Sequence, residues 1–103
     1  MQAGMTFTMS FPIGIPESIF YGYLNKLENE NIQELHIFGY SGENDQHINK
    51  RIINNKNIAR IYFYCDPKNV NNNSYNRKIM ALFEGVKIEI VFEPWTKIWA
   101  LIL

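Results

Sequence analysis

The chain has 103 residues, 47% of them apolar and 15% aromatic, and its formal net charge at pH 7 is zero. This length suits one domain with a modest core, and the apolar fraction excludes an intrinsically disordered chain. A zero net charge gives no strong attraction to nucleic acid or to an anionic membrane. We therefore expect a single domain over residues 1–103, with neither nucleic acid nor a membrane as its partner.

The single cysteine, Cys65, excludes a disulfide within the chain and a cysteine-based zinc site. It lies in an apolar run, where a buried structural thiol is more typical than a nucleophile. No stretch approaches about 18 consecutive apolar residues, and the first residues do not resemble a secretion signal. We expect a cytoplasmic protein without a metal site.

Charge is distributed unevenly along the chain. Residues 1–45 carry one basic and six acidic residues, residues 46–78 carry seven basic residues and one acidic residue, and residues 79–103 have a net charge of −1. Solvated helix faces would account for this pattern, and so would a basic rim that holds a phosphate or an acidic partner.

Apolar and hydroxyl side chains alternate over residues 5–11 (MTFTMSF). A period of two predicts a strand with one buried and one polar face. Because the central strands of a parallel sheet are apolar on both faces, we expect this strand at a sheet edge or at an interface that includes Met5 and Phe7. A turn rich in proline and glycine follows, so residues 1–15 are predicted to form an edge strand and a turn.

Residues 19–27 show the apolar spacing of an amphipathic helix of about three turns, which fades at residues 29–31. Pro16 suits the first position of a helix, and Glu17 favours the positive end of the helix dipole. Residues 35–38 (LHIF) then predict a strand, residues 39–42 (GYSG) a tight turn, and residues 45–54 a second helix capped by Ser41 or Asn44.

Residues 58–65 (IARIYFYC) are dense in β-branched and aromatic residues, which favours the centre of a sheet. A helix over residues 75–84 with Asn73 or Ser74 as its cap, a strand over residues 86–92 and a short helix carrying Trp95 and Trp99 are expected after it. Strands alternating with helices of about ten residues indicate an α/β fold. We expect a small Rossmann-like, three-layer domain of about four mostly parallel strands with helices on the sheet faces.

The end of the strand at residues 35–38 is the most informative part of the sequence. In α/β sheets, ligands and especially phosphates bind where the carboxyl end of a strand meets the N-terminus of a helix, because free N–H groups point there. Arg51 or Arg77 would supply a balancing charge. A simple turn, with Asp45 serving the helix dipole, explains the same residues equally well. The residues expected to contact a ligand are Gly39, Tyr40, Ser41, Gly42, Asn44 and Asp45.

Other chemistry is less well supported. Asp45 and His47 lie two residues apart on a predicted helix and do not share a face, so His47 is expected to be structural. His36 lies inside an apolar strand, where a hydrogen-bonded core histidine is more typical than a ligand. A hydrolase triad of Ser41, His47 and Asp66 would need a GxSxG elbow, which the sequence lacks. No catalytic residue is therefore assigned.

The run FGYSGENDQHI at residues 38–48 is similar to a signature that reads roughly GHSLGENDxHI in an uncharacterised bacterial family of sirtuin-like, Rossmann-type proteins. It also resembles, more loosely, a GHSLG-and-D element of AbiH-like abortive-infection proteins of phage defence. The similarity extends over about residues 15–99. It implies a ligand-facing role for Gly39, Ser41, Asn44 and Asp45, with NAD or ADP-ribose as the ligand.

The chain departs from this family in two ways. Tyr40 and Ser41 are followed directly by Gly42, so the turn is one residue shorter. The resemblance also covers only the C-terminal half of such a domain, because the Gly-rich first turn has no counterpart before Met5. This half-length module would leave sheet edge and apolar surface uncovered, with Met5, Phe7, Trp95 and Trp99 available for an interface.

The leading expectation is therefore a non-catalytic module that binds a nucleotide or another phosphate ligand. The alternative is a protein-interaction module that forms a homo-oligomer, or that docks on a full-length relative and inhibits or completes it. A small NAD-glycohydrolase or hydrolase is the third hypothesis.

Overall fold

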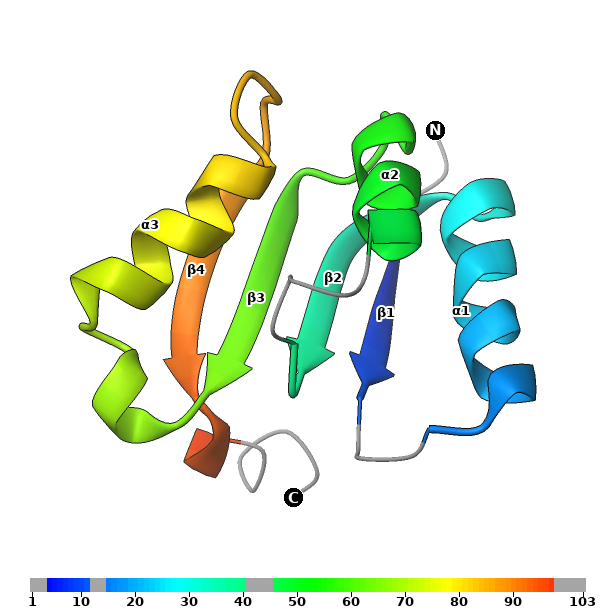
Figure 1. Cartoon of the computed structure of the whole chain (residues 1–103). Helices are drawn as coiled ribbons and strands as arrows, with labels where there is room; N and C mark the ends of the chain where they lie inside the picture. The colour runs from blue at the N-terminus through cyan, green and yellow to red at the C-terminus, as the bar shows by residue number, and fades with distance from the viewer. Residues whose placement is uncertain (1–3, 12–14, 41–45, 98–103) are drawn as a thin grey trace.

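The computed structural model describes residues 4–11, 15–40 and 46–97, and Figure 1 shows the arrangement of the elements. Strands and helices alternate as the sequence predicts, which confirms the Rossmann-like α/β class. Along the chain, the elements are β1 (Met5–Ser10), α1 (Glu17–Asn29), β2 (Ile32–Phe38), α2 (Gln46–Asn54), β3 (Arg60–Cys65), η1 (Pro67–Asn69), α3 (Asn73–Leu82), β4 (Glu89–Pro94) and η2 (Trp95–Lys97).

The four strands form one sheet in the order β1-β2-β3-β4, and every neighbouring pair is parallel. The predicted positions of β1 at an edge and of β3 inside the sheet are confirmed. Connections between neighbouring parallel strands are right-handed crossovers. Because each strand here is added on the same side of the one before it, every connecting helix lies on the same face of the sheet. Figure 1 accordingly shows α2 and α3 in front of the sheet and α1 beside β1. Among the described elements, no α-helix covers the opposite face.

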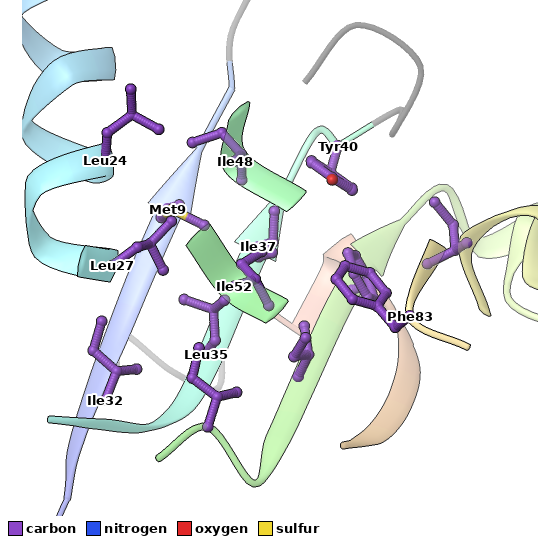
Figure 2. Packing of buried hydrophobic residues seen from close by; sticks show 14 residues of the cluster. Met9, Leu24, Leu27, Ile32, Leu35, Ile37, Tyr40, Ile48, Ile52 and Phe83 are labelled. Atoms are coloured by element: carbon purple, nitrogen blue, oxygen red, sulfur yellow. The ribbon is translucent and has the colours of Figure 1, made fainter. Parts of the chain in front are cut away.

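The core lies between the sheet and these helices (Figure 2). Because side chains alternate across a strand, two rows of sheet residues in register face the helices, and Leu35, Ile37, Ile61 and Phe63 in these rows are fully buried. Removing such a side chain typically costs about 2–5 kcal/mol. The helices contribute Leu24, Leu27, Ile48, Ile52 and Ile79 to the same cluster.

Local signals explain most element boundaries. α1 follows Pro16, which has an extended conformation, and α1 carries Glu17 in its first turn. The cap of α3 is Asn72 rather than Asn73 or Ser74, because the Asn72 side chain accepts hydrogen bonds from the N–H groups of Ser74 and Tyr75. None of the helices in residues 4–11, 15–40 and 46–97 is long and apolar enough to cross a membrane.

Candidate functional site

The predicted ligand-binding corner begins at Gly39, directly after β2. Gly39 has φ +74°, a left-handed conformation that favours glycine, and a Cβ atom there would lie 2.9 Å from the carbonyl oxygen of Phe11. The glycine is therefore needed to turn the chain out of the sheet beside β1.

Tyr40 turns back into the core. Its ring is buried and lies 5.4 Å from the ring of Phe63 and 5.8 Å from that of Phe11. Its carbonyl oxygen accepts a hydrogen bond of 3.4 Å from the hydroxyl of Tyr75. Burial, with a smaller effect from Cys65, raises the pKa of Tyr75 to about 12, so this hydroxyl remains a donor at neutral pH. The Tyr40 side chain thus supports the corner from within the core.

The other predicted ligand contacts, Ser41, Gly42, Asn44 and Asp45, lie outside the described residues. The proposed charge partners occupy separate hollows. Arg51 and Lys50, in the later part of α2, line a hollow of about 280 Å³ against the end of α1. Arg77 lines another hollow, of about 530 Å³, between α3 and the start of β4.

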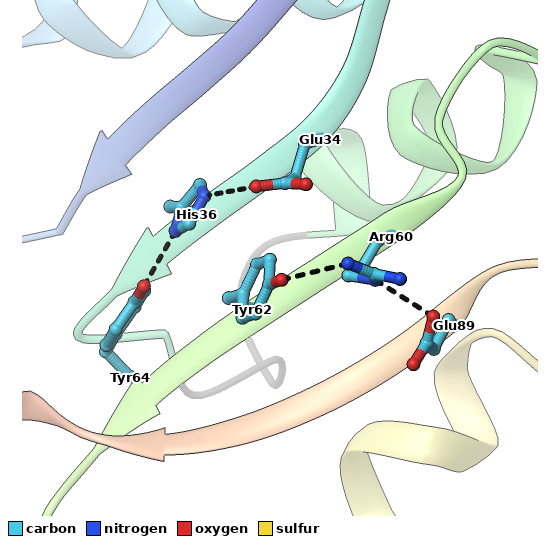
Figure 3. Close-up of polar contacts among 6 residues, drawn as sticks. All are labelled: Glu34, His36, Arg60, Tyr62, Tyr64 and Glu89. Atoms are coloured by element: carbon cyan, nitrogen blue, oxygen red, sulfur yellow. Dashed lines mark hydrogen bonds and ion pairs between the residues drawn. The ribbon is translucent and has the colours of Figure 1, made fainter.

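The face of the sheet without helices carries a second constellation, which the sequence analysis did not identify as a site (Figure 3). Side chains that alternate with the core residues form three rows across the strands. The rows are Thr6, Glu34, Arg60 and Glu89; Thr8, His36, Tyr62 and Val91; and Ser10, Phe38, Tyr64 and Glu93. We call these twelve residues the helix-free face.

His36 connects two residues of this face. Its Nε2 lies 3.1 Å from a carboxylate oxygen of Glu34, and its Nδ1 lies 2.7 Å from the hydroxyl of Tyr64. Because an ionised carboxylate only accepts hydrogen bonds, Nε2 donates to Glu34. The neutral imidazole then accepts the Tyr64 proton at Nδ1. His36 is only 9% exposed and is hydrogen-bonded through both ring nitrogens, as the sequence interpretation anticipated.

A second chain of contacts starts at Arg60 and connects the first row to the second. Arg60 donates to the Tyr62 hydroxyl over 3.1 Å and to the Glu89 carboxylate over 2.9 Å. The bond to Tyr62, followed by the bond to Glu89, raises the pKa of Arg60 above its ordinary value. Beyond β4, Lys97 pairs with Glu93 over 2.8 Å. The face therefore presents three carboxylates, of which Glu89 is paired with Arg60 and Glu93 with Lys97.

The aromatic rings of the face stack on one another. The rings of His36 and Tyr62 lie 4.5 Å apart at an interplanar angle of 10°, and those of Phe38 and Tyr64 lie 4.1 Å apart at 6°. Their flat surfaces are thus already in contact, and both tyrosine hydroxyls are hydrogen-bonded within the face, Tyr62 to Arg60 and Tyr64 to His36. A stacking platform for nucleic-acid bases would instead expose ring surfaces and carry positive charge.

The chemistry of this constellation does not favour nucleophilic catalysis. Burial, with smaller effects from Glu93, Tyr62 and Glu34, raises the pKa of Tyr64 to about 12, so its hydroxyl stays protonated and weakly nucleophilic. Burial likewise raises the pKa of the Cys65 thiol. In the part of the chain that the structure describes, no group of three or more His, Cys, Asp or Glu residues is placed to hold a metal ion.

The four predicted interface residues have different positions. Met5 is exposed at the start of edge strand β1, and Phe7 is half-buried against the core. Trp95 is 53% exposed in η2, directly after edge strand β4. Trp99 lies outside the described residues.

The sequence does contain a signal for the helix-free face. Arg60, Tyr62 and Tyr64 recur at every second position of β3, and Glu34 and His36 do so in β2. Polar and aromatic residues at a period of two indicate a half-exposed face, whereas a strand buried on both faces is continuously apolar. The apolar character of the intervening residues concealed this pattern.

The sequence matches no protein-family model, no curated protein and no solved structure. The resemblance to sirtuin-like and AbiH-like proteins therefore stays an expectation from the sequence. What the chain does has to be inferred from the geometry of its surfaces.

Proposed function

We propose that this chain is a non-catalytic module that binds another protein through its helix-free face. The observation that carries the proposal is a sheet of four parallel strands with its described helices on one side. All-parallel sheets are almost always covered on both faces, because their inner strands are rich in apolar side chains. A partner chain that covers the second face would complete the usual arrangement.

The charges of this face indicate the chemistry of the partner. The three carboxylates of Glu34, Glu89 and Glu93 are balanced by Arg60 on the face and Lys97 just beyond it, which leaves an excess of one negative charge, and the Glu89 side chain is well exposed. The half-buried rings of Tyr62 and Phe38 lie on the same face as these carboxylates. Tyrosine and arginine are enriched in the parts of interfaces that contribute most binding energy. The complementary partner is a polypeptide surface with basic side chains around an apolar centre.

Site-specific crosslinking tests this function. A photoreactive phenylalanine analogue at position 62 should give a discrete adduct with a protein partner in the cells that produce the chain. The matched control is the same analogue at Tyr21, which is 60% exposed on the helix side. No adduct at position 62, or the same adducts at both positions, would contradict the proposal.

A second candidate function is the binding of a nucleotide or phosphate ligand at residues 39–45, as the sequence suggests. The left-handed Gly39, between the end of β2 and α2, favours it, because such a turn lets a ligand approach the backbone. The sheet order, however, does not reverse direction in the described strands, and ligand crevices usually open at such a reversal. We rank this candidate below the protein-binding function.

A further inference from the structure

Strand β4 lies at an edge of the sheet, so some of its backbone N–H and C=O groups point away from β3. The N–H of Glu89 bonds to the carbonyl of Ala59 next to β3 over 3.0 Å. Because backbone groups alternate in direction along a strand, those of Val91 and Glu93 also point towards β3. The N–H and C=O groups of Ile90 and Phe92 therefore point away from the sheet.

The residues on either side limit how far this edge can pair. Pro94 has no N–H, and the N–H of Ile88 already donates to the carbonyl of Val86 over 3.0 Å. The outward N–H groups left for another strand are thus those of Ile90 and Phe92. These two residues are symmetric about Val91.

An apolar hollow lies beside the same edge. It has a volume of about 530 Å³ and lies between the end of α3 and the start of β4. Met80, on its wall, is 54% exposed, and Trp95, just beyond the other end of β4, is 53% exposed. The residues that line the hollow are Arg77, Met80, Ala81, Phe83, Glu84, Gly85, Val86, Ile88 and Ile90.

We propose that a second copy of this chain pairs antiparallel with β4 about a two-fold axis at Val91. Ile90 of each copy then lies opposite Phe92 of the second copy, and each such pair exchanges two N–H···O bonds. Pro94 lies opposite Ile88 of the second copy, so no free N–H is left between them. The paired segment ends at Pro94, so Trp95, the next residue, lies near the start of β4 in the second copy, where Val86 and Ile88 line the apolar hollow.

Backbone complementarity and exposed apolar surface favour a second copy as the occupant, because Pro94, which has no N–H, lies opposite Ile88, whose N–H is already bonded. Glu89 of each copy lies opposite Glu93 of the second copy, and this like-charge pair is offset because Arg60 neutralises Glu89 and Lys97 neutralises Glu93 within each chain. Trp95 is 53% exposed, so the two tryptophans together can bury about 150–250 Å², and the paired β4 edges and Met80 would have to supply most of the roughly 1,200 Å² of a stable interface.

This self-association uses the edge of β4 and is independent of the protein-binding function proposed above. The two sheets would become one sheet of twice the width, and the two helix-free faces would be joined into one larger face. Failure of the crosslink at position 62 would therefore leave the dimer intact, and a monomeric chain would leave the crosslink intact.

Sedimentation equilibrium over a range of concentrations tests the dimer. Wild type should be a concentration-dependent dimer, and Trp95→Ala should raise its dissociation constant at least tenfold, as expected for a buried tryptophan anchor. Tyr21→Ala is the matched control, because Tyr21 is similarly exposed but lies on α1. Its dissociation constant should equal that of wild type.

A disulfide test examines the register independently of Trp95. In a Cys65→Ala background, Val91→Cys places two thiols on the two-fold axis at about 4.5 Å between Cα atoms, within the range that a disulfide accepts. Thr8→Cys, exposed on the opposite edge strand, is the control. We expect a disulfide-linked dimer with Val91→Cys alone. A monomeric wild type, undiminished association of Trp95→Ala, or equal crosslinking of both cysteine variants would each overturn the proposal.

Discussion

The hydroxyl of Tyr64 donates a hydrogen bond to Nδ1 of His36 over 2.7 Å, although the two residues are 28 positions apart in the chain. The register of β2 and β3 brings them together, because His36 pairs with Tyr62 and Phe38 pairs with Tyr64. Tyr64 is only 5% exposed, and stacked neighbouring rings flank both side chains. The helix-free face therefore has a fixed internal structure.

Loss of this bond should be measurable as a loss of stability. Tyr64→Phe removes the donor and leaves a buried imidazole nitrogen unsatisfied, so we expect the free energy of unfolding to fall by about 1–3 kcal/mol. Tyr62→Phe is the control, because the Tyr62 hydroxyl bonds to an arginine that is partly exposed. Urea unfolding should show the larger loss for Tyr64→Phe, and equal losses would contradict this account of the face.

The raised pKa values of Tyr64 and Tyr75 make stability depend on alkaline pH. Both are raised to about 12 in the folded chain, whereas a tyrosine in the unfolded chain titrates near 10. The two tyrosines therefore lose their protons at a lower pH in the unfolded chain than in the folded chain. Their contribution to the free energy of unfolding is complete below pH 10 and should be lost as the pH rises towards 12. Ultraviolet titration of phenolate should show Tyr64 and Tyr75 ionising late, and the late step should be smaller in Tyr64→Phe. Ionisation of all six tyrosines near pH 10 would contradict the assigned burial.

Two glycine substitutions should have opposite signs. Gly39→Ala forces a Cβ into a left-handed residue, 2.9 Å from a carbonyl oxygen, and should destabilise the chain by more than about 1 kcal/mol. Gly22→Ala lies in α1 with no atom within 4 Å of the new Cβ, and should stabilise it by roughly 0.5–1 kcal/mol. Thermal unfolding of both variants measures the difference. A stabilising Gly39→Ala would show that the turn after β2 does not need glycine.

The second candidate function predicts a ligand response. NAD, ADP-ribose, ATP or GTP at about 100 times its dissociation constant should stabilise the native state by about 2.7 kcal/mol. Thermal-shift titration of wild type and Asp45→Ala measures this, and the variant should lose the response. If no nucleotide shifts the wild-type transition, residues 39–45 are a structural turn.

The regular pattern of the chain was sufficient to predict the fold. The period of two in β1 predicted both its polar face and its edge position, since Thr6 and Thr8 are exposed and Met9 is buried. Helical spacing placed Leu24 and Leu27 in the core. These predictions succeed because burial of one face dominates the choice of local structure.

The helix-free face was harder to predict because it depends on strand order. Alternating β and α elements are compatible with helices on one or on both sides of a sheet, and only the order of the strands decides between them. The cross-strand contact between His36 and Tyr64 depends on the register of two strands, which no local pattern encodes. The predicted cap of α3, Asn73 or Ser74, was wrong by at least one residue, because the observed cap is Asn72. Consecutive asparagines can each form the same cap, so the sequence does not distinguish them.

The most direct test of the protein-binding function is the affinity of the purified chain for the partner that crosslinks at position 62. Isothermal titration calorimetry should show Tyr62→Ala binding at least tenfold more weakly than wild type, with Tyr21→Ala unchanged, because Tyr62 lies on the helix-free face and Tyr21 on the helix side. Equal affinities for wild type and both variants would show that the helix-free face is not the binding surface.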